Sequence, residues 1–242
     1  MSRTVVVTGG ARGIGRAAVE RFVAAGERVV AVGRDPVALG GLDVETHVCD
    51  VTDEAAVTDT FARIGVVDVL VNNAGMGESA PLAATTLESW SRHLAVNATG
   101  AFLCIRAVVP GMRERGGGAV VTVASTAGRA GVPYTTAYSA SKHAAIGLTR
   151  AVAAEVAGTG VRVNAVCPTF VRTEMTVRSI DNIVARTGRS AEQAEAALAA
   201  AAPLGRLLEP EEVAETIVFL ASPAAAAING QAVVIDGGGI QA

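Results

Sequence analysis

Tyr138 and Lys142 are four residues apart in a stretch with helical character, so both side chains lie on one face of the predicted helix. A phenol has an ordinary pKa of about 10, and a nearby ammonium stabilises the phenolate and lowers that pKa. The pair could therefore act as an acid or a base near neutral pH. Lys142 is also the only lysine of the chain, beside 19 arginines. A coding bias toward arginine would explain the number, whereas a function that needs an amine with a shiftable pKa would explain the position.

Ser125 follows a predicted strand at residues 119–124 and precedes Tyr138 by 13 residues. Its hydroxyl could donate a hydrogen bond to a carbonyl oxygen. A serine at the end of a strand is also a common cap or turn residue. Both interpretations stay open at this point.

A glycine-rich turn, containing Gly9, Gly13 and Gly15, joins the first predicted strand at residues 4–8 to the first predicted helix at 16–25. Small residues let the chain turn sharply, so that backbone N–H groups can approach a pyrophosphate at a helix N-terminus. The Gly-Lys-Ser/Thr ending of a Walker loop is absent from this turn. The turn therefore predicts a dinucleotide-binding fold.

The residues after the second predicted strand, at 28–32, indicate which dinucleotide binds. Asp35 follows Gly15 by 20 residues, which is the spacing of an acid that binds the adenosine ribose of NAD. Arg34 comes first, however, and could bind the 2′-phosphate of NADP, with Arg12 approaching from the glycine turn. We favour NADP(H) over NAD(H), while each arginine could also be a solvated surface charge.

Strands alternate with helices along the whole chain, which predicts a parallel sheet with helices on both faces. We expect one doubly wound Rossmann domain over residues 1–242, of class α/β and with about seven strands. The remaining strands are predicted near residues 46–49, 67–71, 119–124, 161–166 and 232–235, and the remaining helices near 53–64, 89–114, 136–157 and 211–220.

Two connections differ from this regular pattern. Residues 35–45 leave room for only one or two helical turns. Residues 172–202 are the longest segment without a predicted strand, and Ser190 and Gln193 have the pattern of a capping box that opens an alanine-rich helix closed by Pro203. Because this segment follows the carboxyl end of a strand, we expect a substrate lid rather than a surface insertion.

Composition excludes several classes of protein. The chain has 242 residues, of which 50% are hydrophobic, and a net charge of −3, so a general nucleic-acid surface is not expected. No apolar run approaches the length of a membrane span, and the sequence enters a strand directly, without a signal peptide. Cys49, Cys104 and Cys167 lack the spacing of a disulfide framework or a metal site. We therefore expect a cytoplasmic protein without a metal.

Five features together resemble one protein family: the glycine turn, Asn72-Asn73-Ala74-Gly75, Asn97, Ser125 and Tyr138-Ser139-Ala140-Ser141-Lys142. In order and spacing they are similar to the short-chain dehydrogenase/reductase family over essentially the whole chain. The resemblance implies NAD(P)-dependent interconversion of a carbonyl and an alcohol. It implies that Tyr138 is the acid/base and that Lys142 lowers its pKa and binds the nicotinamide ribose. Ser125 would polarise the carbonyl, and Asn97 would fix a helix kink and a water in the proton relay.

The resemblance also implies contacts with the cofactor. An acid and its neighbour, Asp50 and Val51, would contact adenine, the Asn72 segment would lie beneath the adenosine ribose, and the segment after Pro168 would hold the nicotinamide. The implied cofactor residues are Gly9, Arg12, Gly13, Ile14, Gly15, Arg34, Asp50, Val51, Asn72, Ala74, Gly75, Tyr138, Lys142, Pro168, Val171 and Thr173. Thr169 stands where the family usually has glycine, and we expect its side chain to narrow the site.

Within the family, the chain resembles 3-oxoacyl thioester reductases and the ketoreductases of aromatic polyketide synthesis. This likeness is carried by residues 138–143, 163–168, 205–206 and 210–214, while the glycine-rich run that follows residue 75 in those ketoreductases is missing. The lid carries four arginines, whose charges would suit the phosphate of a CoA or a carrier protein or are ordinary surface charges. They are Arg172, Arg178, Arg186 and Arg189. The residues expected to line an apolar substrate pocket, if they are not core, are Tyr134, Thr169, Phe170 and Met175.

Other functions stay open. An NAD(H)-dependent dehydrogenase of a sugar, cyclic or steroid alcohol would keep the same chemistry. A non-catalytic NAD(P)-binding regulator would not need Tyr138 and Lys142, and a methyltransferase would give Lys142 no role. The resemblance further implies a homotetramer that pairs the two long helices at residues 89–114 and 136–157.

Overall fold

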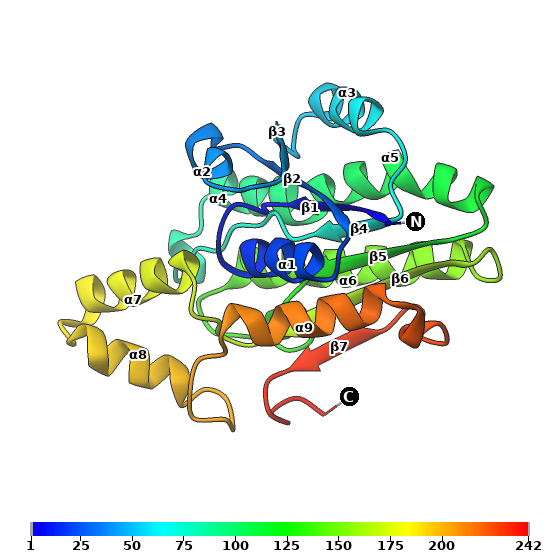
Figure 1. The fold of residues 1–242 in the computed structure, drawn as a ribbon. Helices are drawn as coiled ribbons and strands as arrows, with labels where there is room; N and C mark the ends of the chain where they lie inside the picture. The colour runs from blue at the N-terminus through cyan, green and yellow to red at the C-terminus, as the bar shows by residue number, and fades with distance from the viewer. Residues whose placement is uncertain (1, 242) are drawn as a thin grey trace.

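The computed structural model describes residues 2–241 and contains a seven-stranded sheet (Figure 1). The strand order is β3-β2-β1-β4-β5-β6-β7, and every neighbouring pair is parallel. The order changes direction between β1 and β4, and doubly wound sheets bind ligands at such a point. The predicted fold class is thus confirmed. The strands are β1 Thr4–Thr8, β2 Arg28–Gly33, β3 Glu45–Val48, β4 Val69–Asn72, β5 Gly118–Val123, β6 Val161–Pro168 and β7 Ala232–Ile235.

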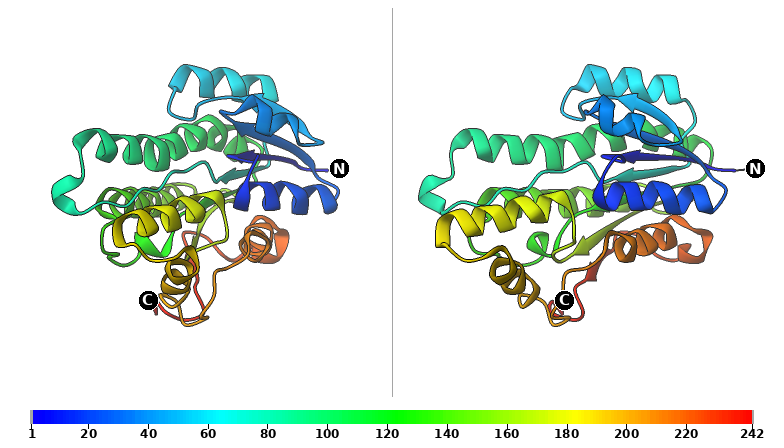
Figure 2. Two further views of the ribbon diagram at one scale, coloured as in Figure 1. Left: turned by 90° about the vertical axis from the view of Figure 1, so that its left-hand side faces the viewer. Right: turned by 60° about the vertical axis from the view of Figure 1, so that its left-hand side comes forward.

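Helices cover both faces of the sheet because alternate residues of each strand point to opposite sides. Val5 and Val7 of β1 belong to an apolar core with α1 and α9, whereas Val6 belongs to a second core with α3 and α5. Figure 2 shows these layers on either side of the sheet. The helices are α1 Gly13–Ala24, α2 Pro36–Gly40, α3 Glu54–Ile64, α4 Leu87–Leu94, α5 Gly100–Glu114, α6 Thr136–Glu155, α7 Glu174–Thr187, α8 Ala191–Ala199 and α9 Pro210–Ala221.

The helix predicted over residues 89–114 is not regular throughout. A π-helical segment, η2 Ala95–Thr99, separates α4 from α5. Leu87–Glu114 as a whole is long and apolar enough to cross a membrane by length and composition alone, although the sequence shows no single apolar run of that length. Cys104 and Met112 of this stretch are buried in the core beneath the sheet. Its length and apolar character therefore reflect its place as a core helix.

The crossover between β2 and β3 contains only α2, which is one short turn of helix. Asp35 caps this turn, since its Oδ1 accepts hydrogen bonds from the N–H groups of Val37 and Ala38 at 3.0 and 3.1 Å. The expectation of a shortened crossover is confirmed, and Asp35 has a structural role there that the spacing rule for ribose-binding acids does not anticipate.

Residues 172–202 form a pair of helices, α7 and α8, that extends from the carboxyl ends of the strands (Figure 1). The predicted capping box of Ser190 and Gln193 is present at the start of α8. The capping box predicts α8, whereas the sequence analysis does not predict α7. The chain on either side of the pair is joined by two backbone bonds, from Arg172 N–H to Leu208 O at 2.8 Å and from Leu208 N–H to Phe170 O at 2.9 Å.

Candidate active site

Ser125, Tyr138 and Lys142 meet where β5 and the first turns of α6 adjoin. Ser125 lies two residues beyond the end of β5, and its Oγ accepts a hydrogen bond from the N–H of Ala127 at 3.1 Å. Tyr138 and Lys142 lie one turn apart on α6, and Lys142 Nζ is 5.7 Å from the centre of the Tyr138 ring. Lys142 Nζ also donates a hydrogen bond to the backbone oxygen of Val123 at 2.8 Å. The three side chains singled out in the sequence are therefore neighbours in space.

Burial controls the protonation of this group. It raises the pKa of Tyr138 above its usual value, and the neighbouring Ser125 hydroxyl acts in the opposite direction. The expected lowering of the Tyr138 pKa by Lys142 is not found in the protein alone, because desolvation outweighs other effects. Burial also lowers the pKa of Lys142 to about 8. The site thus holds a protonated phenol beside an amine that loses its proton readily.

Asn97 lies in the π-helical segment η2, at the irregularity that the resemblance implies. Its amide is held on three sides: Nδ2 donates to Met76 O and to Ser141 Oγ, both at 2.9 Å, and Oδ1 accepts from Met76 N–H at 2.8 Å. A side-chain atom at Gly75 would come within 3.5 Å of Lys142 Nζ and 3.2 Å of Asn97 Oδ1. Asn97 and Lys142 therefore face the same backbone segment, and Ser141 is a supporting residue that the sequence analysis missed.

The glycine turn has a backbone shape that other residues cannot adopt. Gly9 and Gly13 have positive φ angles, of 64° and 51°. A Cβ at Gly15 would lie 2.2 Å from Gly9 O and 2.4 Å from Asn73 Nδ2, which is far inside van der Waals contact. Asn73 Nδ2 donates to Thr8 O and Gly9 O, both at 3.0 Å. This cradle, closed to any side chain, fits a dinucleotide pyrophosphate.

Asn73 is a second residue that the sequence analysis missed, since the residues selected from this segment were Asn72, Ala74 and Gly75. The signal was the paired asparagines after β4. Ala74 N–H donates to Thr8 Oγ1 at 3.1 Å and so helps to position the turn. Asn72 is buried, and its Nδ2 donates to Ala101 O at 3.3 Å. Its place is therefore in the protein interior behind the turn.

The segment after β6 approaches the glycine turn from the opposite side. A Cβ at Gly13 would lie 3.0 Å from Thr173 Cγ2. Val171 is buried, and its carbonyl oxygen accepts a hydrogen bond from Thr176 Oγ1 at 2.6 Å. Pro168 ends β6. The structure thus brings the predicted nicotinamide segment beside the predicted pyrophosphate turn.

The two arginines predicted to bind a 2′-phosphate are both paired with carboxylates. Arg34 Nη1 lies 3.6 Å from Asp50 Oδ2. Arg12 Nη2 lies 2.6 Å from Asp35 Oδ2, and its Nη1 lies 3.1 Å from Glu174 Oε2. Asp50 is desolvated, but the hydrogen bonds from Thr52 and the Arg34 charge outweigh this and lower its pKa. Of the other predicted cofactor residues in this region, Val51 is buried, and Ile14 of α1 packs against the core.

A cavity of about 1020 Å³ lies between α4, α7 and the segment before α6, and Gly77 of its wall adjoins Tyr138, which does not itself line the cavity. Tyr134 lines it and is 66% exposed, with a positive φ of 66°. Met175 contacts the cavity wall, because a Cβ at Gly77 would lie 3.1 Å from Met175 Sδ. Thr169 and Phe170 are not among the residues that line this cavity, and Phe170 takes part in the backbone bridge to Leu208. Of the four residues expected to line the substrate pocket, Tyr134 lines this cavity and Met175 contacts its wall, whereas Thr169 and Phe170 do neither.

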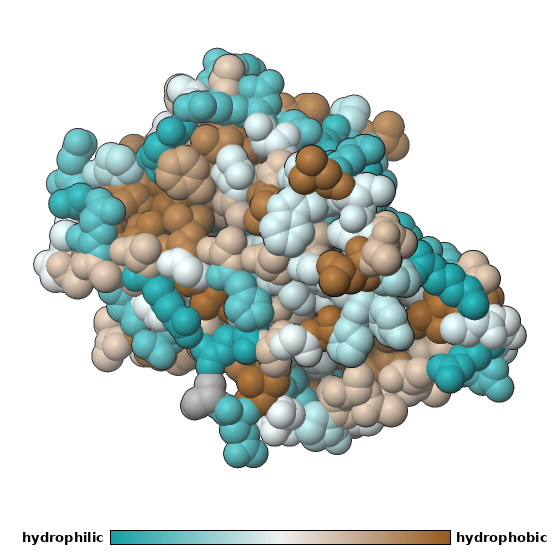
Figure 3. Space-filling view, turned by 180° about the vertical axis from the view of Figure 1, so that it is seen from behind, coloured by the Kyte–Doolittle hydropathy of each residue, from teal (hydrophilic) through white to brown (hydrophobic). Residues whose placement is uncertain are grey.

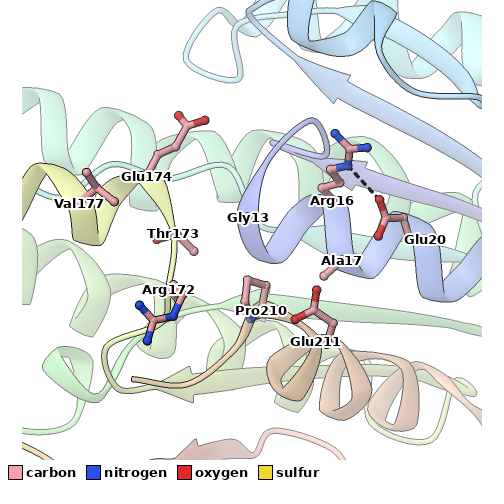
Figure 4. A pocket seen from close by; sticks show the side chains of 10 residues that line it. All are labelled: Gly13, Arg16, Ala17, Glu20, Arg172, Thr173, Glu174, Val177, Pro210 and Glu211. Atoms are coloured by element: carbon pink, nitrogen blue, oxygen red, sulfur yellow. Dashed lines mark hydrogen bonds and ion pairs between the residues drawn. The ribbon is translucent and has the colours of Figure 1, made fainter. Parts of the chain in front are cut away.

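The arginines at 172–202 divide between two environments. Arg178 and Arg186 line the cavity from α7. Arg172 turns away, since it pairs with Glu195 at 2.9 Å and with Glu209 at 3.1 Å. Figure 4 shows Arg172 instead at a separate hollow of about 400 Å³ behind the glycine turn. Gly13 and Thr173 line that hollow, so it lies against the glycine turn, and Ser125, Tyr138 and Lys142 are not among its lining residues.

His93 is a fully buried residue that braces the cavity wall. Its Nδ1 is 2.7 Å from Ser89 O, and its Nε2 accepts a hydrogen bond from the N–H of Glu78 at 3.1 Å. The Glu78 carboxylate in turn binds Ser89 and Arg92. Both ring nitrogens of His93 are thus occupied, so His93 is not available as an acid or base of the site.

Comparison with known proteins agrees with this arrangement. Residues 9–239 match the family model described as enoyl-(acyl carrier protein) reductase. The chain is 39% identical to the acetoacetyl-CoA reductase of Rhizobium meliloti, covering 98% of both chains. It is 40% identical to the D-threitol dehydrogenase of Mycolicibacterium smegmatis, covering 98% of this chain and 92% of that one. The crystal structure of a variant of the actinorhodin polyketide ketoreductase with NADPH superposes with a TM-score of 0.92 at 38% identity, covering 98% and 97% of the two chains.

Proposed function

Because this chain belongs to the short-chain dehydrogenase/reductase family of NAD(P)-dependent oxidoreductases, we propose that it reduces the ketone of a 3-oxoacyl thioester or polyketide chain with NADPH. The observation that carries the proposal is the group of Ser125, Tyr138 and Lys142 next to the large cavity, since Gly77 and Ala137, which adjoin Tyr138, line that cavity. The proposal covers thioesters of CoA and of a carrier protein alike.

Each residue of the group has a distinct task in this reaction. The Ser125 hydroxyl donates a hydrogen bond to the substrate carbonyl oxygen, and the Tyr138 hydroxyl protonates that oxygen as the alcohol forms. Lys142 supplies positive charge next to the phenol, which stabilises the phenolate left behind. Asn97 fixes the Met76 backbone and Ser141, and so holds the helix and loop around Lys142 in place. The nicotinamide, when bound, supplies the hydride.

We assign the remaining predicted residues to cofactor binding, except Asn72, which is buried behind the turn. The glycine turn and Thr173 would hold the pyrophosphate, Asp50 and Val51 the adenine, and Lys142 the nicotinamide ribose. Arg12 and Arg34 support NADP(H) over NAD(H), since a guanidinium binds a phosphate through two parallel hydrogen bonds. In this proposal residues 172–202 act as the substrate lid of a single domain that spans residues 1–242.

Two features support a long, anionic substrate. The cavity of about 1020 Å³ is at the upper end of the sizes usual for ligand pockets. Arg178 and Arg186 line it and could pair with the phosphate of a CoA or a phosphopantetheine arm. The likeness to D-threitol dehydrogenase supports the second candidate, an NAD(H)-dependent dehydrogenase of a sugar, cyclic or steroid alcohol. A non-catalytic NAD(P)-binding regulator is the third.

Loss of nicotinamide absorbance with acetoacetyl-CoA, measured with NADPH and NADH in parallel, tests the proposal. We expect turnover with NADPH and none in Tyr138→Phe. Turnover only with NADH would overturn the cofactor assignment but keep the chemistry. If neither cofactor is consumed, although one of them binds, oxidation of D-threitol and of cyclic alcohols would distinguish the second candidate from the regulator.

We further propose that the chain forms a cytoplasmic homotetramer. Apolar side chains are exposed on the face opposite α1 and α9, which Figure 3 shows, and Phe102 of α5 is 41% exposed. β7 is an edge strand, and its four residues are only partly buried. Size-exclusion chromatography with light scattering should give four times the mass of one chain, and a monomer peak would defeat this assignment.

A further inference from the structure

Arg12 joins three segments that are distant in the sequence. It belongs to the glycine turn, Asp35 follows β2, and Glu174 is the first residue of α7. The Arg12 guanidinium binds Asp35 Oδ2 through Nη2 at 2.6 Å and Glu174 Oε2 through Nη1 at 3.1 Å. All three side chains are about half exposed, so a ligand can reach them. We call this arrangement the Arg12 bridge.

The Arg12 bridge lies at the edge of the predicted cofactor groove. Thr173, the neighbour of Glu174, is so close to Gly13 that a Cβ there would lie 3.0 Å from its methyl group. The bridge therefore ties the first turn of α7 directly to the turn that fits a pyrophosphate. A cofactor that enters this groove meets the bridge on its adenosine side, where Asp35 stands.

With these ion pairs in place, the charges at this edge of the cofactor groove do not favour the binding of a phosphate. Two guanidinium groups, of Arg12 and Arg34, face three carboxylates, of Asp35, Asp50 and Glu174. A 2′-phosphate dianion is attracted by the first two groups and repelled by the other three. Both terminal nitrogens of Arg12 already donate a hydrogen bond to a carboxylate, so a 2′-phosphate that approaches these nitrogens must compete with Asp35 and Glu174 for them.

We propose that Glu174 is a specificity-determining residue of the cofactor site: it competes with the 2′-phosphate for Arg12 and so weakens the preference for NADP(H). This inference rests on the proposed use of a nicotinamide cofactor. Removal of the Glu174 charge leaves Arg12 with one carboxylate partner and frees Nη1 for a phosphate oxygen. NAD(H) has no 2′-phosphate, so its binding does not depend on this exchange.

The same competition couples the type of cofactor to the helical pair α7–α8. When a 2′-phosphate takes Arg12, the link between the glycine turn and the start of α7 is lost. When NAD(H) binds, the link remains. We therefore expect α7 to be less firmly held in the NADP complex than in the NAD complex.

Equilibrium titrations with NADPH and NADH, followed by the fluorescence of the reduced nicotinamide, test the proposal without turnover. Glu174→Gln should tighten NADPH binding about three- to fivefold, the range expected for one solvent-exposed charge, and leave NADH binding unchanged. The control is Glu192→Gln, which removes the corresponding first-turn charge of α8 and should change neither constant. Asp35→Asn keeps a side-chain oxygen for the cap of α2 and should act in the same direction as Glu174→Gln.

A second readout is trypsin cleavage after Arg178, Arg186 and Arg189 of the helical pair. In the wild type, NADP⁺ should leave these sites more susceptible than NAD⁺ does, and in Glu174→Gln the two complexes should be cleaved alike. An unchanged ratio of NADPH to NADH affinity in Glu174→Gln would overturn the role of Glu174 alone. If the wild type binds neither dinucleotide, the proposed function fails together with it.

Discussion

The ammonium of Lys142 donates a hydrogen bond to the backbone oxygen of Val123 at 2.8 Å, so the helix that carries the acid/base pair is joined to the strand that precedes Ser125. Lys142 is only 5% exposed, and within residues 2–241 the structure gives it no carboxylate partner. A buried ammonium without a counter-charge is unfavourable for folding. The geometry of the site is thus maintained at the expense of stability.

Replacement of Lys142 by Met should stabilise the protein while it abolishes catalysis. Burial lowers the pKa of Lys142 from 10.5 to about 8. At every pH below about 8 the folded protein therefore carries the full free-energy cost of the buried charge, which the unfolded chain does not. The gain, after loss of the bond to Val123, should be roughly 1–2 kcal/mol in unfolding free energy at pH 7. Urea unfolding of both proteins measures it.

The pH dependence provides the check on this prediction. Between pH 8 and 10.5 the folded protein has lost the Lys142 proton and the unfolded chain has not, so the wild type should gain stability relative to Lys142→Met as the pH rises. A constant difference across this range would show that the burial of this charge is not what limits stability.

Lys142→Arg keeps the positive charge but should lower kcat by about 100-fold or more, because proton transfer by a positioned side chain contributes at least that much. The larger guanidinium cannot take the place of an ammonium that lies 3.5 Å from the Cβ position of Gly75. Steady-state kinetics measures the loss of kcat, and a separate cofactor titration measures any loss of cofactor affinity. Wild-type kcat in this variant would remove Lys142 from the mechanism.

A methyl group at Gly15 should prevent dinucleotide binding, since its Cβ would lie 2.2 Å from Gly9 O. We expect roughly a tenfold or greater rise in the dissociation constant for NADPH in Gly15→Ala. Gly147→Ala is the matched control. It lies inside α6, has no atom within 4 Å of its Cβ position, and should stabilise the protein by about 0.5–1 kcal/mol. Equal NADPH affinity in the two variants would contradict this account of the turn.

Tyr134 has a φ of 66°, a conformation that is strained for an aromatic residue. Tyr134→Asn should relieve the strain and raise the unfolding free energy by about 0.5–1 kcal/mol, and Tyr134→Phe should not. If Tyr134 also contacts the substrate, Tyr134→Asn will raise KM while kcat changes little. Thermal unfolding of both variants measures the change in stability, and steady-state kinetics measures the change in KM. A loss of stability in Tyr134→Asn would refute the strain argument.

Glu212 should contribute stability that is lost in acid. The Arg206 guanidinium binds it at 2.6 and 2.8 Å and, with the N–H of Glu209, lowers its pKa to about 2. The stabilisation is fully present above pH 4.5 and disappears as the pH falls through about 2. Since both side chains are over one-third exposed, Glu212→Gln should cost only about 1 kcal/mol at pH 7. Wild type and variant should become equally stable only below about pH 2.

The sequence predicts the sheet well because buried parallel strands are short, apolar and separated by glycine or helix. It predicts the catalytic group well for a different reason: Ser125, Tyr138 and Lys142 stand at fixed positions relative to β5 and α6. Asn97 also follows from the motif, but the π-helical segment around it does not, because no residue pattern separates it from a regular helix.

The sequence could not predict which carboxylates pair with the arginines near the cofactor site. Arg12 and Arg34 look alike as candidates for a phosphate, yet each is paired with a carboxylate from another segment. The support that Asn73 gives to the glycine turn depends likewise on the contact between β1 and β4. Such relationships arise from tertiary packing and have no local signal.

The backbone bridge between Phe170, Arg172 and Leu208 brings the two ends of the helical pair α7–α8 to one point. An insertion whose ends meet can change in length or composition without altering the distance that the surrounding chain must span. Natural variation, or an engineer, could therefore exchange residues 175–207 as a cassette while the sheet, Tyr138, Thr173 and Glu174 stay where they are. Substrate specificity can therefore evolve in this fold while the catalytic residues stay unchanged.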